Sequence, residues 1–216
     1  MPDKVKILIC LLYYLPHRTG MQLYIERVSE ELARRGHEVT ILCARHKPEL
    51  PTEEVINGVR IVRLWAPPIP ISRGMVMPSY PYAAYQLIRQ HDVVSIHTPM
   101  LETALLSLLA RMAGRKIVAT HHGDLILPKG GMNRFITNVM FELYKFMARD
   151  AGRLVAYSQD YADNSYYLKP FMDKVRVIYP PVHMPQANPQ RAAELRAQWS
   201  HNGGPVIGYE IGRAHV

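Results

Sequence analysis

Short apolar runs alternate with amphipathic segments along most of this chain, and that alternation restricts the fold more than any other feature. Residues 5–12 form a continuous apolar run, which is typical of a strand buried on both faces of a sheet. Apolar residues then recur at helical spacing over 21–32, Gly36 is placed to end that helix, and 38–44 form a second apolar run. A strand, a helix and a strand in about 40 residues predict a βαβ unit, and therefore a parallel sheet.

The same alternation continues along the chain. Further strands are expected at 59–65, 92–96, 116–120, 153–157 and 174–178, with helices at 82–90, 99–113, 133–149 and 159–168 and a proline-rich loop at 66–81. Pro99 is expected at the first position of its helix, and Asn57-Gly58 marks a tight turn before the third strand. The predicted fold class is α/β, with a doubly wound parallel sheet.

Composition and charge narrow the classes of partner. The 216 residues are 48% hydrophobic, an ordinary globular composition, and 26 Lys+Arg against 18 Asp+Glu give a net charge of +8. A basic balance is compatible with nucleic acid, an anionic membrane surface or a phosphorylated substrate. Because the basic residues are dispersed and not interleaved with aromatic residues in one stripe, no nucleic-acid partner is expected.

The cysteines and the apolar runs bear on the compartment. Cys10 and Cys43 both lie in apolar runs, so we expect buried thiols rather than a disulfide or zinc ligands. No small-residue cleavage site follows the first apolar run, and no run approaches the roughly 20 apolar residues of a membrane span. These features predict a soluble cytoplasmic protein.

Polar residues collect where the predicted strands end. The carboxyl ends of parallel strands share one edge of the sheet, and ligands of doubly wound folds bind there. One histidine at a strand end is more often a structural hydrogen-bonding group, but several polar loops on one edge indicate a crevice for hydroxyls and phosphates. The residues concerned are Thr19 and Gly20 after the first strand, His97 after the fourth, His121, His122, Gly123 and Asp124 after the fifth, and Ser158 after the sixth.

Several common sites are excluded. Gly20 is the only glycine between the first strand and its helix, so the dinucleotide-binding G-x-G-x-x-G pattern is absent, as are G-x-x-x-x-G-K-[ST] and G-x-S-x-G. His121 and His122 are adjacent, so they point in different directions, and no set of carboxylates and histidines at ligand spacing surrounds them. We therefore expect no metal site.

Five segments together resemble family-four glycosyltransferases, which are retaining enzymes of GT-B architecture. The likeness runs from about residue 4 to 209. It is carried by KILI at 6–9, YLPHRTGM at 14–21, EELARRGHEVT at 30–40, ATHHGD at 119–124 and VIYPPV at 177–182.

The resemblance implies a division of the chain. Residues 1–182 correspond to the N-terminal, Rossmann-like domain on the acceptor side, 183–205 to the connection between domains, and 206–209 to the first strand of a donor-binding domain. The family's diphosphate-binding Arg/Lys pair and E-x7-E carboxylates have no counterpart in this chain. Residues 211–216 match a translated sequencing adapter, so we expect a truncated protein with a non-native tail at 210–216.

The resemblance also implies roles for particular residues. His122 matches the family's histidine that contacts the donor sugar near the reacting centre, and it is the candidate catalytic residue. Gly20 matches the second glycine of the family's loop beside the sugar and diphosphate, while Thr19 replaces the usual first glycine. The other candidate substrate-binding residues are His97, Gly123, Asp124 and Ser158.

The function expected is that of the N-terminal part of a retaining glycosyltransferase. It would move a sugar from a nucleotide-sugar to a glycan, a lipid-linked acceptor or a small molecule, with neither cofactor nor metal, and this fragment alone would be inactive. A nucleotide-sugar 2-epimerase, which shares the architecture, and a non-catalytic binding module remain alternatives. Met75, Val76 and Met77, with the apolar and basic helix carrying Phe135 and Val139, suggest peripheral contact with an anionic membrane.

Overall fold

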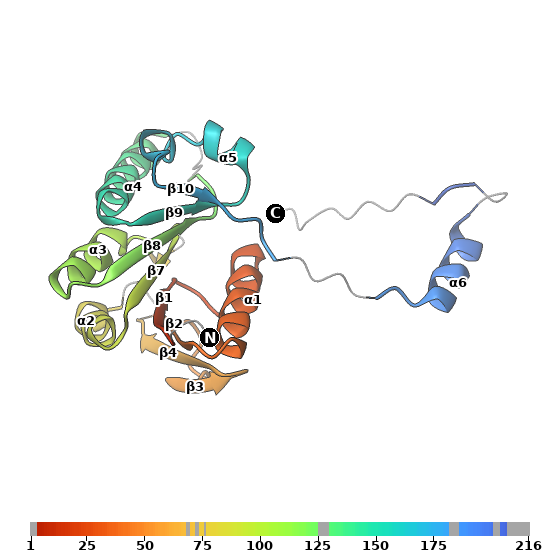
Figure 1. The fold of residues 1–216 in the computed structure, drawn as a ribbon, viewed down its shortest axis with the longest axis horizontal. Coiled ribbons are helices and arrows are strands. Elements are labelled where there is room, and N and C mark those ends of the chain that lie inside the picture. The colour runs from red at the N-terminus through yellow and green to blue at the C-terminus, as the bar shows by residue number, and fades with distance from the viewer. Residues whose placement is uncertain are drawn as a thin grey trace. The chain divides into compact units, whose positions relative to one another are not determined.

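A computed structural model describes residues 4–67, 70–71, 74–75, 77–124, 130–181, 186–200 and 204–206. The chain divides into two compact units, Met1–Pro181 and Val182–Val216. The first unit contains a sheet (Figure 1) whose strands follow the order β10 (Val175–Val177), β9 (Arg153–Ala156), β8 (Lys116–His121), β7 (Val93–Thr98), β1 (Lys6–Cys10), β2 (Glu38–Arg45), β4 (Val59–Trp65) and β3 (Glu53–Ile56).

Neighbouring strands of this sheet run parallel, except that β3 is antiparallel to β4. Helices follow the strands as predicted and cover both faces. Helix α1 (Gly20–Arg34) lies on one side of the sheet, and α2 (Tyr80–Gln90), α3 (Thr103–Met112) and α4 (Gly131–Asp150) lie on the other (Figure 1). The predicted α/β fold with a doubly wound parallel sheet is confirmed.

Alternate residues of each central strand supply two separate cores. Leu8 and Cys10 of β1 belong to the core beneath α2, α3 and α4, whereas Ile9 belongs with Ile25 to the core beneath α1. A strand buried on both faces needs apolar residues at every position, which is why the strands read as continuous apolar runs. Cys10 and Cys43 are buried free thiols, as predicted.

Two turns bear out the sequence signals that predicted them. Gly36, just after α1, has a φ of +91°, which suits the glycine that ends a helix. Asn57 and Gly58, with φ of 50° and 82°, form the two-residue turn of a hairpin. The strand that enters this turn, β3, was not predicted, although the Asn-Gly pair beside an alternating segment is a standard hairpin signal.

The helix predicted at 99–113 begins later than expected. Strand β7 continues through Thr98, and the buried Met100 packs in the core before α3 starts at Thr103. The prediction that Pro99 occupies the first helical position is therefore wrong: Glu102 is the N-cap residue. The chain needs the intervening residues to turn from the sheet edge into the helical layer.

Other boundaries also differ from the predictions. The helix predicted at 159–168 ends early, as α5 (Gln159–Asn164), and a 3₁₀ turn, η1 (Lys169–Phe171), follows it. The predicted loop at 66–81 contains a small hairpin of β5 (Pro70–Ile71) and β6 (Gly74–Met75). Met77, predicted as part of a membrane-contacting loop, is only 3% exposed and packs in the core, so that expectation is wrong for Met77; Val76 lies outside the described residues.

The second unit contains α6 (Pro189–Trp199). Asn188 caps this helix, because its side-chain oxygen accepts hydrogen bonds from the backbone of Gln190 and Arg191. Val206 is described and lies outside any strand, while 207–209 and the tail at 210–216 lie outside the described residues. Within the described part of the chain, no helix is both long enough and apolar enough to cross a membrane.

Candidate functional site

The register of β7 and β8 brings three histidines to the carboxyl edge of the sheet. His97 pairs with Thr120 and Thr98 pairs with His121, so the chain leaves β8 directly beside the end of β7. Because successive strand residues face opposite sides, the rings of His121 and His122 diverge. The His122 ring lies against Tyr24 of α1, and the His121 ring against Tyr144 of α4. The side chains of His121 and His122 therefore lie on opposite faces of the sheet.

His97 and His122 form a hydrogen-bonded chain with two hydroxyl side chains. The Nδ1 atom of His97 lies 2.8 Å from Nε2 of His122, and Nε2 of His97 lies 3.1 Å from the Ser95 hydroxyl. On the other side, Nδ1 of His122 is hydrogen-bonded to the hydroxyl of Tyr157, the residue that follows β9. Both ring nitrogens of His122 are thus occupied by protein groups. We call Ser95, His97, His122 and Tyr157 the relay.

Burial keeps the relay uncharged. Desolvation lowers the pKa of His97 to about 3, and desolvation together with the neighbouring His97 and His121 lowers the pKa of His122 to about 2. Burial also raises the pKa of the Tyr157 phenol. At neutral pH the relay therefore consists of two neutral imidazoles and a neutral phenol. It can offer hydrogen bonds to a ligand but no positive charge.

On the opposite face of the sheet, hydrogen bonds connect His121 with β7, with the loop after β8 and, through Asp124, with the segment after α5. Its Nδ1 lies 2.7 Å from the Thr98 hydroxyl and its Nε2 lies 2.9 Å from the Asp124 carboxylate, which also accepts a 2.9 Å hydrogen bond from Ser165. Burial alone would raise the pKa of Asp124, but the hydrogen bonds from His121 and Ser165 outweigh it, and the net pKa is lowered. Asp124 is therefore an ionised group that holds the loop after β8 beside the segment that follows α5.

The other predicted site residues lie at helix starts or in open backbone. Thr19 is the N-cap residue of α1, and its hydroxyl is hydrogen-bonded to the Gln22 side chain. Among the described residues, this contact does not involve any member of the relay. In the part of the chain that the structure describes, a Cβ added at Gly20 or Gly123 would meet no atom within 4 Å, so this part of the chain leaves room for a ligand at both positions. The Ser158 hydroxyl caps α5 by accepting a 3.1 Å hydrogen bond from the backbone of Tyr161.

Sequence reasoning missed the two tyrosines of this site. Tyr157 directly precedes Ser158 at the end of β9, so the strand-end rule that identified the histidines would have identified it as well. Tyr24 comes from α1, and its ring centroid lies 5.4 Å from that of His122 and 5.1 Å from that of Tyr157. No local signal marks Tyr24, because its apolar spacing is that of an ordinary core position.

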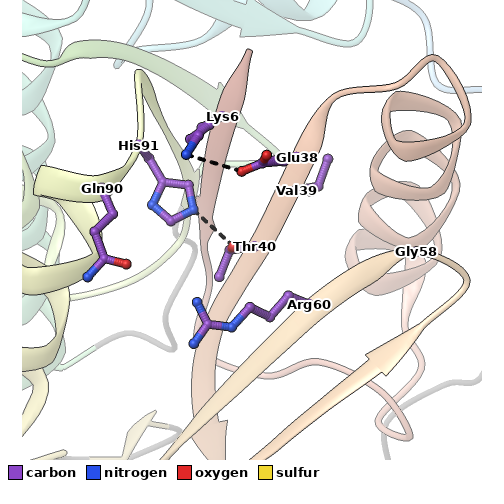
Figure 2. Close-up of a pocket in the computed structure, with 8 residues that line it drawn as sticks. All are labelled: Lys6, Glu38, Val39, Thr40, Gly58, Arg60, Gln90 and His91. Carbon is purple, nitrogen blue, oxygen red and sulfur yellow. Dashed lines mark hydrogen bonds and ion pairs between the residues drawn. The ribbon is translucent and has the colours of Figure 1, made fainter. Parts of the chain in front are cut away.

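A cavity of about 230 Å³ lies at the amino ends of the strands, at the edge opposite the relay (Figure 2). Its polar side chains contact protein groups: the ring nitrogens of His91 lie 2.6 Å from the Leu87 carbonyl and 2.9 Å from the Thr40 hydroxyl, and Lys6 pairs with Glu38. Because ligands of open α/β sheets bind at the carboxyl ends of the strands, we place the candidate site at the relay. Within the described ranges, no group of three or more His, Cys, Asp or Glu side chains is arranged to hold a metal ion.

Comparisons with known proteins identify the family and the fold of this chain. The family described as "Glycosyl transferase 4-like domain" matches residues 19–181. A curated relative, the 2-deoxystreptamine N-acetyl-D-glucosaminyltransferase of Streptomyces fradiae, is 28% identical over 90% of this chain and 50% of its own length.

Two solved structures show the same fold. The Anabaena protein HepE, in complex with UDP and glucose, has a TM-score of 0.62 and 15% identity, covering 90% of this chain and 50% of its own. Sucrose-phosphate synthase from Thermosynechococcus elongatus has a TM-score of 0.60 and 15% identity, covering 90% of this chain and 52% of its own. The chain thus spans about half the length of the proteins it resembles.

Proposed function

Because this chain belongs to the glycosyl transferase 4-like domain family, we propose that it forms the acceptor-side half of a retaining glycosyltransferase that uses a nucleotide-sugar. The observation that carries the proposal is the position of His122 at the carboxyl edge of β8, inside the matched range 19–181. The family match favours sugar transfer over a 2-epimerase or a non-catalytic binding module.

The chemistry assigned to this half is binding and positioning. The neutral relay supplies no charge for a departing diphosphate, so we expect cationic groups outside the relay to stabilise it. Among the described residues, Gly20 at the start of α1 and Gly123 in the loop after β8 leave space beside the backbone for the sugar and its phosphates. We assign no covalent nucleophile, cofactor or metal.

The relatives suggest which substrates to test first. HepE was solved with UDP and glucose, which supports a uridine diphosphate sugar as the first donor. The name of the Streptomyces fradiae relative describes transfer of an N-acetylglucosaminyl group to 2-deoxystreptamine, which supports a small polar acceptor alongside glycans and lipid-linked acceptors.

The proposal implies that this chain is one part of a longer protein, and it is tested on that protein. We expect sugar transfer from a nucleotide-sugar, and a decrease of about a hundredfold or more in kcat for His122→Ala, because a preorganised group at the reacting centre is removed. His37→Ala is the matched control, since His37 lies in the turn between α1 and β2 at the opposite edge of the sheet and accepts a hydrogen bond from the backbone of Val5. Epimer formed from nucleotide-sugar without acceptor would favour the isomerase, and full activity in His122→Ala would refute the assignment.

We also propose a cytoplasmic location with peripheral contact to an anionic membrane through α4. Phe135 is 64% exposed and Val139 is 38% exposed on this helix, and Arg134 and Arg149 are exposed as well. Anionic vesicles should carry the protein upward in a flotation gradient at low salt, and Phe135→Ser should reduce the floating fraction. Val55→Ser, on the edge strand β3, should leave it unchanged. Absence of flotation at any salt concentration would remove the proposal.

A further inference from the structure

Both ring nitrogens of His122 are hydrogen-bonded to protein side chains, so another polar atom of the site is better placed to contact the substrate. Its Nε2 is paired with His97 and its Nδ1 with the Tyr157 hydroxyl. A sugar hydroxyl can reach either nitrogen only by breaking one of these bonds. The Tyr157 oxygen, by contrast, keeps lone pairs after its bond to His122 is made. Tyr157 is half-buried, whereas His97 is only 3% exposed.

The relay has a preferred direction. Each neutral imidazole carries one N–H, which lies on either Nδ1 or Nε2. The donor of the hydrogen bond at one end of the relay therefore determines the donor of every other hydrogen bond along it. A phenol is a stronger acid than a neutral imidazole N–H, so Tyr157 donates to Nδ1 of His122. His122 then donates from Nε2 to Nδ1 of His97, and His97 donates from Nε2 to the Ser95 hydroxyl. In this arrangement the Tyr157 oxygen is left as a hydrogen-bond acceptor.

The Tyr157 ring is held in place from the α1 side. Its centroid lies 5.1 Å from that of Tyr24 and 5.1 Å from that of His122, with the latter pair edge-to-face. The Tyr24 ring also lies against the His122 ring, with the centroids 5.4 Å apart. The phenol is therefore fixed by ring packing on one side and by the relay on the other.

We propose that Tyr157 contacts the substrate by accepting a hydrogen bond from a carbohydrate hydroxyl, and that His97 is a positioning residue that orients Tyr157 through His122. This inference rests on the proposed function, because it names the polar contact made at that same site. His122 thus links the buried end of the relay to the Tyr157 hydroxyl, which contacts the sugar.

The relay is tested first in the 216-residue chain by NMR of ¹⁵N-labelled histidine side chains, with the His122 signals assigned from a His122→Gln variant. We expect a single neutral tautomer of His122, protonated on Nε2. Tyr157→Phe removes one hydroxyl and should shift the Nδ1 resonance of His122 or mix its tautomers. Tyr14→Phe is the matched control: it removes a buried hydroxyl outside the relay and should leave the resonance unchanged. An Nδ1-protonated His122, or signals that do not respond to Tyr157→Phe, would overturn the relay.

The substrate contact is tested by kinetics of the longer protein, with KM measured separately for donor and acceptor. Tyr157→Phe should raise one of the two KM values about 3- to 10-fold, the cost of one neutral hydrogen bond, and the substrate affected identifies the source of the hydroxyl. His97→Asn should raise the same KM, and the double variant should be no worse than Tyr157→Phe alone, because both changes remove one contact. Tyr14→Phe should change neither value.

The outcomes separate the two proposals. Unchanged KM values in Tyr157→Phe would overturn the substrate contact, and additive effects of Tyr157→Phe and His97→Asn would overturn the positioning role of His97. If the longer protein transfers no sugar at all, the proposed function fails, and the NMR experiment then decides on the relay by itself.

Discussion

Arg63 should contribute far more to stability than Arg60, although both lie on β4 and both pair with a glutamate of β3. The Arg63 side chain is 1% exposed, lies 2.5 Å from Glu54, and donates a 3.0 Å hydrogen bond to the Leu15 carbonyl. Arg60 is 40% exposed and pairs at 2.7 Å with Glu53, which is itself 53% exposed. The two pairs therefore differ mainly in burial.

The difference in burial sets the expected magnitudes. Arg63→Ala leaves a partly buried carboxylate and the carbonyls of Leu15 and Pro51 without this donor, so it should lower the free energy of unfolding by about 3–5 kcal/mol. Arg60→Ala breaks a solvated pair and should cost about 0–1 kcal/mol. At about 2–4 °C per kcal/mol for a domain of this size, Arg63→Ala should lower Tm by about 6–20 °C.

Urea unfolding followed by circular dichroism measures both variants directly. Arg63→Met retains much of the side-chain volume, so comparing it with Arg63→Ala separates lost packing from lost charge pairing. Equal destabilisation by Arg63→Ala and Arg60→Ala, or a loss below about 1 kcal/mol for Arg63→Ala, would refute the argument from burial.

Three further predictions follow from the described residues. Histidines in the unfolded chain bind protons below about pH 6.5, whereas His97 and His122 in the folded chain stay neutral until the pH is far lower. Each of these two histidines should therefore lower the free energy of unfolding by about 1.4 kcal/mol per pH unit between pH 6.5 and 5. His97→Asn should reduce this slope in urea titrations, and a flat profile in the unmodified chain would contradict the lowered pKa values of His97 and His122. Gly36→Ala should lower the free energy of unfolding by about 1–2 kcal/mol, because position 36 has a positive φ. Gly20→Ala, where the described residues leave open space around the new Cβ, should lower it by less than about 0.5 kcal/mol in the same assay. Equal losses in the two variants would argue against backbone strain at Gly36. Finally, the 216-residue chain should unfold cooperatively yet show no nucleotide-sugar binding by calorimetry and no transfer, and measured transfer that His122→Ala abolishes would refute the division of labour between the two halves.

The amino-acid sequence by itself determined the fold class and most of its elements. The apolar runs at β1 and β2, the helical spacing of α1 and the glycine at position 36 are local patterns, and each corresponds to the element that was predicted. The short elements were harder to predict. Strand β3 is an edge strand of only four residues that begins with two glutamates. The start of α3 depends on where β7 ends, which packing decides.

The candidate site could likewise be predicted from the sequence only in part. From the amino-acid sequence alone, the strand-end rule places His97, His122 and Ser158 at one edge of the sheet. The tertiary structure alone decided that His97 meets His122, that Tyr157 occupies the remaining ring nitrogen, and that Tyr24 packs against both. The physical reason is that these contacts depend on the register of β7 against β8 and on which face of the sheet each side chain points toward. Register and facing are properties of paired strands, so no single stretch of sequence encodes them.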